Sequence, residues 1–217
     1  METIGFGTGL ERSGKRSPSR LALALGVATA GAWIFGCAPV IPRATTVPDA
    51  AVGSPEEHVV FPEGKRPHES PIYTHNELEV DAPPEQVWAW LVRAQRWPEW
   101  YGNAKDIDIE GGSPDLALGT MFHWTTFGVR VHTRIEELVP NRRLSWSGKG
   151  LLGATAYHGW VILPREGGGC IVITEETQQG IVPSAGRFFL RSGLLEWHQK
   201  WLVGLAKMAA NGSPLTP

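Results

Sequence analysis

The chain has 217 residues, 42% of them hydrophobic, which is enough for the core of one domain of ordinary size with a tail, or of two very small domains. Its 20 basic and 22 acidic residues leave a net charge of −2, so the basic surplus of a nucleic-acid-binding protein is missing. The two cysteines, Cys37 and Cys170, are far apart in the sequence, and neither a disulfide framework nor a cysteine zinc site is indicated. Nine of the ten tryptophans fall between Trp88 and Trp201, which indicates a large apolar interior or pocket there.

The first 37 residues have the pattern of an export signal. Four basic residues precede residues 21–35, which are fifteen positions without a charged side chain. This run is short for a transmembrane helix, which needs about 20 apolar residues. It ends at Gly36 and Cys37, and this junction resembles the lipobox of bacterial lipoproteins. The resemblance implies that Cys37 is diacylated and becomes the first residue of the mature chain.

Two other outcomes stay open for this segment, an uncleaved single-pass anchor or ordinary cleavage after Ala28-Thr29-Ala30. All three outcomes export the rest of the chain, and the first two anchor it through its N-terminus to a membrane of the bacterial cell envelope. Residues 38–71 are rich in proline and lack a helix or strand period, which is typical of a tether. We therefore predict an export signal or anchor at 1–37, a tether at 38–71, one domain at 72–211 and a disordered tail at 212–217.

The order of strand and helix patterns within the predicted domain is typical of an α+β fold. A strand pattern at 77–81 is followed by Pro83 and Pro84, which favour a short helix, and Trp97-Pro98 favours a second one. Six more strands are predicted at residues 105–109, 120–125, 129–138, 143–148, 155–163 and 170–177. Apolar residues at spacings of three and four then predict one long amphipathic helix over 184–210. Because strands and helices are segregated, we expect an antiparallel sheet with the last helix on one face.

Five short motifs give this domain a family resemblance. They are Val80-x-Ala82-Pro83-Pro84-x-x-Val87-Trp88, Trp97-Pro98-Glu99-Trp100, Leu118-Gly119-Thr120-x-Phe122, Pro140-x-Arg142-Arg143-Leu144-x-Trp146 and Trp160-x-Ile162-x-Pro164. In this order they resemble the START-like (SRPBCC) superfamily, and within it the polyketide cyclase/dehydrase and lipid-transport branch, over about residues 74–210. The resemblance implies a helix-grip fold, in which a curved seven-stranded antiparallel sheet wraps around a long C-terminal helix and two short helices follow the first strand. It also implies an apolar cavity between sheet and helix, whereas the family has no invariant catalytic set.

Strand alternation, combined with this resemblance, predicts which side chains face the cavity. The candidates are Phe122, Trp124, Val131, Trp146, His158 and Trp160 from the strands, with Trp197 and Trp201 from the helix. So many indole rings in one domain are hard to pack without leaving space, and each N–H needs a partner. The alternative is that these aromatic side chains simply fill a core, since an apolar stripe at helical spacing is usually packing.

His158 and Glu176 are the candidate catalytic or polar binding residues. Alternation puts His158 on the same face as Trp160, where a desolvated imidazole acts as a hydrogen-bond donor or general base. Glu176 shares that face, whereas a register slip of one residue brings Glu175 there instead. Alternatively, His158 binds a backbone carbonyl and the acids lie at a solvated strand end. The sequence has no metal-binding or cofactor motif, so neither a metal ion nor a cofactor is predicted.

Three functions are compatible with these features. The first is a membrane-tethered extracytoplasmic module that binds or transports a hydrophobic small molecule, either a lipid or an aromatic metabolite. The second is an enzyme of the cyclase, aromatase or dehydratase type, in which His158 and an acid move protons on a carbonyl-bearing substrate. The third is a protein-binding domain with a vestigial pocket. Export favours the first, because the acyl-carrier substrates of polyketide chemistry are cytoplasmic in the family that the domain resembles.

Overall fold

The computed structural model describes residues 57–214, so the predicted export signal, Cys37 and most of the predicted tether lie outside the described residues. Seven strands form one antiparallel sheet in the order β1-β7-β6-β5-β4-β3-β2. Their bounds are β1 (Ile72–Val80), β2 (Lys105–Ile109), β3 (Met121–Thr126), β4 (Val129–Val139), β5 (Arg143–Lys149), β6 (Thr155–Pro164) and β7 (Cys170–Gln179). Consecutive strands from β2 to β7 are neighbours, and β1 joins the sheet beside β7.

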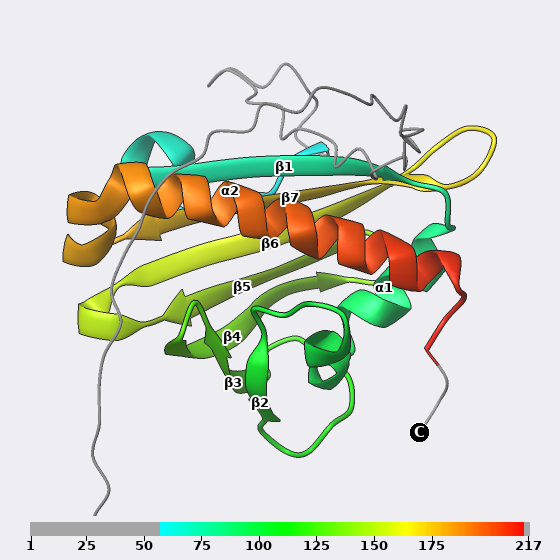
Figure 1. The fold of residues 1–217 in the computed structure, drawn as a ribbon, viewed down its shortest axis with the longest axis horizontal. Helices are drawn as coiled ribbons and strands as arrows, with labels where there is room; N and C mark the ends of the chain where they lie inside the picture. The colour runs from blue at the N-terminus through cyan, green and yellow to red at the C-terminus, as the bar shows by residue number, and fades with distance from the viewer. Residues whose placement is uncertain (1–56, 215–217) are drawn as a thin grey trace, which may run out of the picture. The chain divides into compact units, whose positions relative to one another are not determined.

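The helices follow the order that the sequence predicts. The two short helices after the first strand are α1 (Pro84–Leu91) and the 3-10 helix η3 (Ala94–Glu99), and 3-10 turns form at η2 (Pro67–Glu69) and η4 (Leu151–Gly153). The long helix α2 (Ile181–Ala210) lies along one face of the sheet (Figure 1). The predicted α+β helix-grip fold is therefore confirmed. None of the helices within residues 57–214 is long and apolar enough to cross a lipid bilayer.

Tryptophan rings form the centre of the main core, on the face of the sheet that α2 covers. Trp97 of η3 is fully buried, and its ring centroid lies 5.5 Å from that of Trp124, 5.7 Å from Trp146 and 5.1 Å from Trp201. The buried Nε1–H of Trp97 donates to the carbonyl of Leu91 at 3.0 Å. The pairs with Trp124 and Trp201 are edge-to-face, a geometry that adds to the stabilisation that burial alone gives. Much of the unusual tryptophan content thus goes into ring-on-ring packing.

The buried face of α2 is rotated slightly from the apolar stripe that the sequence predicts, which consists of Leu190, Leu194, Trp197, Trp201, Leu205 and Met208. Leu194, Trp201 and Leu205 of the stripe are buried, whereas Leu190 is 38% exposed and Trp197 is half-buried. His198 is buried instead, at 2% exposure. The helix therefore presents a polar side chain to the inner face of the sheet at a position adjacent to the predicted stripe.

The opposite, outer face of the sheet is partly covered by the residues that precede β1. Val59 is buried there in a small cluster with Tyr157, Val161 and Ile173. Gly159 makes room for it, since a Cβ at that position would lie 2.5 Å from Cγ1 of Val59. The amide of Val59 also donates to Oε2 of Glu175 at 2.8 Å. The last part of the predicted 38–71 tether thus packs on the sheet.

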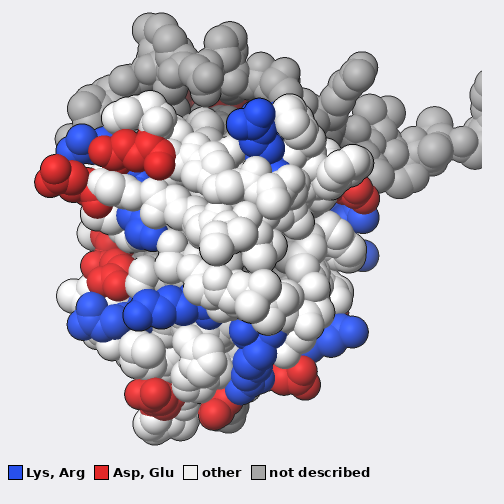
Figure 2. Space-filling view, turned by 90° about the vertical axis from the view of Figure 1, so that its left-hand side faces the viewer, with Lys and Arg blue, Asp and Glu red and all other residues white. Residues whose placement is uncertain are grey.

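The end of the domain where α2 begins carries a broad area without charged side chains. Figure 2 shows this end, with lysine, arginine and acidic side chains mostly around the uncharged area. Ile181, Phe188 and Phe189 at the start of α2 are exposed, as are Leu151 and Leu152 of the neighbouring η4. An exposed group of large apolar side chains of this kind commonly marks an interaction or ligand-entry site.

Candidate functional site

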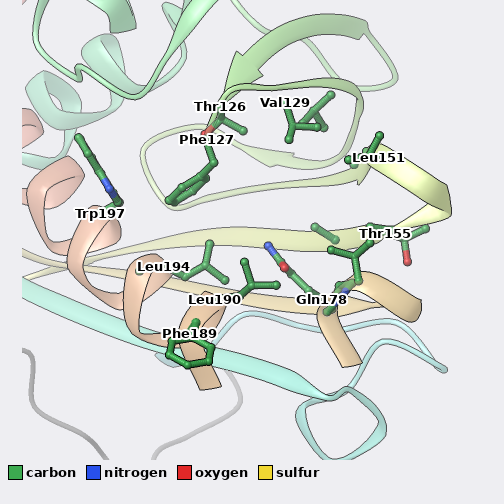
Figure 3. Close-up of a pocket in the computed structure, with 18 residues that line it drawn as sticks. Thr126, Phe127, Val129, Leu151, Thr155, Gln178, Phe189, Leu190, Leu194 and Trp197 are labelled. Atoms are coloured by element: carbon green, nitrogen blue, oxygen red, sulfur yellow. The ribbon is translucent and has the colours of Figure 1, made fainter. Parts of the chain in front are cut away.

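A cavity of about 400 Å³ opens at this end, between the first half of α2 and strands β3 to β7 (Figure 3). Its wall is mainly apolar and includes Phe127, Val129, Leu151, Phe189, Leu190, Leu194 and Trp197. Gly148 and Ala156 contribute little side-chain volume, which leaves space beside Val131. The volume lies in the range of sites for small organic ligands, roughly 300–1,000 Å³.

A second cavity, of about 80 Å³, lies beside the first and is lined by more deeply buried side chains. The two cavities share lining residues, among them Val131, Gln178 and Leu194, so they adjoin one another. Aromatic rings of Tyr101, Trp124, Trp146 and Trp201 form much of the wall of the smaller cavity. The rest of its wall includes His158, Glu176 and His198, which make it the polar end of an otherwise apolar space.

These three polar residues form a buried cluster, with His158 and His198 2% exposed and Glu176 7% exposed. Nδ1 of His158 lies 3.1 Å from Oε2 of Glu176, and Nε2 of His198 lies 3.3 Å from the same oxygen. The other carboxylate oxygen, Oε1, accepts a hydrogen bond from Nε2 of Gln178 at 2.6 Å. Both oxygens of this buried carboxylate are therefore engaged by named side chains.

The strand register explains how residues distant in sequence reach this cluster. Glu176 of β7 is paired across the sheet with His158 of β6 on one side and with Thr74 of β1 on the other. Directly paired residues point to the same face of a sheet, so all three point toward α2. Helix α2 then supplies His198 from above, because Leu194 and Trp201 on the same helix face are buried against the sheet.

Burial and the neighbouring groups act in opposite directions on the acidity of this site. Burial alone would raise the pKa of Glu176, but the imidazoles of His158 and His198 outweigh it and hold that pKa well below its usual range. Burial also lowers the pKa of His158, and the opposing effect of Glu176 does not restore it. The site therefore favours an ionised carboxylate beside a neutral His158 imidazole.

The residues predicted to face the cavity are distributed over three environments. Val131 and Trp197 line the larger cavity, while Trp124, Trp146, His158 and Trp201 line the smaller one together with Val131 and Glu176. Phe122 and Trp160 are fully buried in the packed core and belong to the wall of neither of these two cavities. Glu175, the alternative to Glu176, lies on the outer face beside Val59.

The structure brings several residues to the site that were not predicted from the sequence. His198 is one, although it lies four residues after Leu194 and four before Leu202, at a spacing that indicates a shared helix face. Thr74 and Gln178 are others, and both flank Glu176 through the sheet register or through a direct hydrogen bond. No sequence pattern indicated that Phe127 and Phe189 lie at the mouth of the larger cavity, because Phe127 is in a turn and Phe189 is at an exposed helix position.

Comparisons with known proteins agree with this architecture. Residues 74–210 match the model of a family described as polyketide cyclase / dehydrase and lipid transport. The comparison with curated proteins gives no match. Among solved structures, hypothetical protein jhp0584 from Helicobacter pylori is similar at 25% identity and a TM-score of 0.66, over 76% of this chain and 99% of that one.

Two further solved structures share the fold at lower identity. A START superfamily protein from Mycobacterium smegmatis gives a TM-score of 0.54 at 12% identity, over 64% of this chain and 97% of that one. The protein TTHA0849 from Thermus thermophilus gives a TM-score of 0.54 at 20% identity, over 66% of this chain and 100% of that one. The helix-grip arrangement is thus common to chains whose sequences have diverged widely.

Proposed function

The chain belongs to the polyketide cyclase / dehydrase and lipid transport family, and from this premise we propose that it binds a hydrophobic small molecule, a lipid or an aromatic metabolite, between the sheet and α2. The observation that carries the proposal is the apolar cavity of about 400 Å³, open at an apolar end of the domain. Apolar walls favour a ligand with a large water-avoiding surface. The family and the fold suggest the same class of ligand.

The polar cluster gives the ligand an orientation. The apolar body of the ligand occupies the larger cavity, and its polar end points toward His158, Glu176 and Gln178 in the smaller one. A few polar groups at one end of an apolar pocket fix the orientation of the ligand. If the ligand binds the wrong way round, these buried groups lose their hydrogen-bond partners and the free energy of the complex rises. A ligand with a hydroxyl, carbonyl or carboxyl group at one end fits this arrangement.

We also propose that the chain is exported and held at a membrane through Cys37. The sequence pattern of residues 1–37 supports this location. The exposed side chains of Leu152, Ile181, Phe188 and Phe189 beside the mouth of the cavity fit it as well, because a poorly soluble ligand enters more readily along an apolar surface than through water. A tethered carrier of this kind handles lipid or envelope metabolites.

The test is a titration of purified residues 57–217 with a fluorescent fatty acid, together with native mass spectrometry of the chain purified from its own host. Saturable binding of about one probe per chain is expected. Ala156→Phe places a ring in the shared wall of both cavities and should abolish binding, whereas Ala210→Phe adds the same ring at an exposed position of α2 and should not. Equal binding by both variants, or none by the wild type, would contradict the proposal.

The buried imidazoles beside Glu176 favour enzymatic proton transfer as a second candidate function. The two candidates differ in what happens to the bound molecule. A carrier releases its co-purified compound unchanged after prolonged incubation, as measured by mass spectrometry of the extract. An enzyme of the dehydratase or cyclase type converts it, and His158→Gln then stops the conversion while binding persists.

A further inference from the structure

Each histidine of the buried cluster lies between a threonine hydroxyl and the carboxylate of Glu176. Oγ1 of Thr174 donates to the carbonyl of Gly159 at 3.3 Å, and Oγ1 of Thr74 donates to the carbonyl of Glu176 at 3.4 Å. A hydroxyl has one hydrogen, so while that hydrogen is directed at the carbonyl, the hydroxyl oxygen accepts from the imidazole beside it. In this arrangement Nε2 of His158 donates to Thr174 at 2.7 Å, and Nδ1 of His198 donates to Thr74 at 3.3 Å.

The nitrogens on the other side of both rings then carry lone pairs. A neutral imidazole has one N–H, and in each ring that N–H is directed at a threonine. In this tautomer, Nδ1 of His158 and Nε2 of His198 face Oε2 of Glu176, at 3.1 and 3.3 Å, with no hydrogen between them. Three acceptor atoms thus converge in a buried place, and this arrangement is repulsive unless a positive charge lies among them.

We propose that this charge is a divalent transition-metal ion, bound by Nδ1 of His158, Nε2 of His198 and Oε2 of Glu176. Without an ion, each imidazole can instead donate to Oε2 of Glu176 and accept from its threonine. Protonation of both imidazoles is a further arrangement, but it buries two cations against one carboxylate, with ring centroids 4.7 Å apart. Desolvation makes such an arrangement costly. One ion with two neutral imidazoles and one carboxylate satisfies all three lone pairs at once.

The spacing of the three atoms suits such an ion. Zinc binds histidine nitrogen and carboxylate oxygen at about 2.0–2.2 Å, so tetrahedral ligand atoms lie roughly 3.3 Å from one another. The two nitrogen-to-oxygen distances here are 3.1 and 3.3 Å, and all three atoms lie within 4.8 Å of one another. Two histidines and one carboxylate are also the ligand set of sites that leave a coordination position open, for Zn²⁺ or Fe²⁺.

The surroundings have the features of an outer shell around a metal. With the ion bound, Thr74 and Thr174 would accept the remaining N–H of each imidazole and so fix its tautomer, and Gln178 holds the second carboxylate oxygen. The open position faces the smaller cavity, whose wall contains all three ligands. An oxygen at the polar end of the bound molecule would occupy it; this last step rests on the proposed function, whereas metal binding does not.

The outer-face cluster around Glu175 provides a matched control, because its three titratable side chains also lie close together. His58 and His75 lie 3.2 and 2.9 Å from Oε1 of Glu175. The hydroxyl of Tyr73 donates to this same oxygen at 2.5 Å, and the amide of Val59 occupies the other oxygen. Hydrogen-bond donors already satisfy that carboxylate, so this cluster is not expected to take an ion.

The experiment is a set of metal titrations of the full chain in detergent after treatment with a chelator, using Zn²⁺, Co²⁺ and anaerobic Fe²⁺ separately. The wild type should bind about one ion per chain, with visible absorption bands for Co²⁺ and competition against a coloured chelator for Zn²⁺. Glu176→Gln and His198→Gln should weaken the affinity at least tenfold. Thr174→Val, which leaves all three ligands in place, should weaken it by about 10–100-fold. His75→Gln should leave the affinity unchanged.

Circular dichroism shows whether each variant is folded. If Glu176→Gln does not fold, the metal affinity of Thr174→Val decides whether the ion binds at this site. A wild type without Co²⁺ absorption bands, or with chelator competition no stronger than that of Glu176→Gln, would overturn the metal site and leave a proton-bridged cluster. An equal loss of affinity in His75→Gln would overturn it too, because the ion would then lie on the outer face. Fatty-acid binding by the metal-free chain tests the proposed function separately.

Discussion

Glu175 and Glu176 are neighbours in β7 and point to opposite faces of the sheet, where each carboxylate meets two histidine side chains. On the outer face, His58 and His75 lie 3.2 and 2.9 Å from Glu175. On the inner face, the two corresponding distances to Glu176 are 3.1 and 3.3 Å. The two sites differ in what surrounds them, because the outer one fastens residues 58–59 to the sheet and the inner one borders a cavity.

The His75–Glu175 pair on the outer face of the sheet predicts a stability that depends on pH. Burial alone would lower the pKa of His75, but Glu175 and Glu77 outweigh it and raise that pKa above its ordinary value of about 6.5. A raised pKa in the folded state gives stabilisation that is fully present below about pH 6.5 and is lost as the pH rises through the folded value. The pKa of Glu175 is lowered, since its partners outweigh burial, so its contribution is lost only in acid, below about pH 4.5.

The measurement is urea unfolding of the wild type and His75→Gln at pH 5.5 and pH 8. The variant should lose more unfolding free energy at pH 5.5 than at pH 8, because the wild type has the His75–Glu175 attraction chiefly at the lower pH. His68→Gln is the control, since His68 is an exposed histidine in η2. A loss that is equal at the two pH values would show that His75 contributes packing only.

The contact between Val59 and Gly159 predicts a steric coupling across the outer face. A Cβ at residue 159 would lie 2.5 Å from Val59 and 2.8 Å from Oγ of Ser145, so Gly159→Ala should cost about 1–3 kcal/mol. Val59→Ala in the same chain should recover part of that loss. Gly102→Ala is the control, because nothing lies within 4 Å of the added Cβ and the residue is exposed. If the losses of unfolding free energy in Gly159→Ala and Val59→Ala simply added up in the double variant, residue 59 would not lie against the sheet in solution.

Trp201 and Trp197 of α2 should respond differently to truncation. Trp201 is 1% exposed, stacks on Tyr101 at 4.2 Å and contacts Trp160 at 5.1 Å, so Trp201→Ala should cost about 3–5 kcal/mol. Trp197 is half-buried at the wall of the larger cavity, and Trp197→Ala should cost about 1 kcal/mol. It should nevertheless weaken binding of the fluorescent fatty acid severalfold.

Urea unfolding followed by circular dichroism, together with the probe titration, distinguishes these effects. The two variants are matched in chemistry, since each replaces one indole of the same helix by a methyl group. If Trp201→Ala kept nearly full stability, that ring would contribute little to the core and would serve mainly as a wall of the cavity. If Trp197→Ala bound the probe as tightly as the wild type, the larger cavity would not be where the ligand lies.

The predicted lipid anchor is tested by metabolic labelling with a fatty-acid analogue. Wild-type chain should carry the label and appear in the membrane fraction of the host, because acylated Cys37 ends the apolar run of the export signal. Cys37→Ser should lose the label, and Cys170→Ser, at the only other cysteine, should keep it. Persistent labelling of Cys37→Ser would leave an uncleaved anchor or ordinary cleavage as the outcomes for this segment.

The sequence by itself was sufficient for the fold. Alternation within 129–138 and 155–163, the prolines before α1 and the apolar spacing in α2 each concern residues near one another in the chain. Such local patterns determine whether a segment becomes a strand or a helix, and their order, with the family motifs, was enough for the helix-grip fold. The inner-face positions of His158 and Trp160 follow from the same alternation.

Only the tertiary structure decided what meets across the sheet. Which of Glu175 and Glu176 faces the cavity depends on the register of β7. An alternating sequence pattern does not exclude a register shifted by one residue. His198 reaches Glu176 because the docked face of α2 is rotated slightly from the apolar stripe, and Val59 reaches Gly159 because a segment without regular structure lies across β6. These contacts join residues up to 124 positions apart, as for Thr74 and His198, and the free energy that fixes them comes from packing of the whole domain, which no local pattern contains.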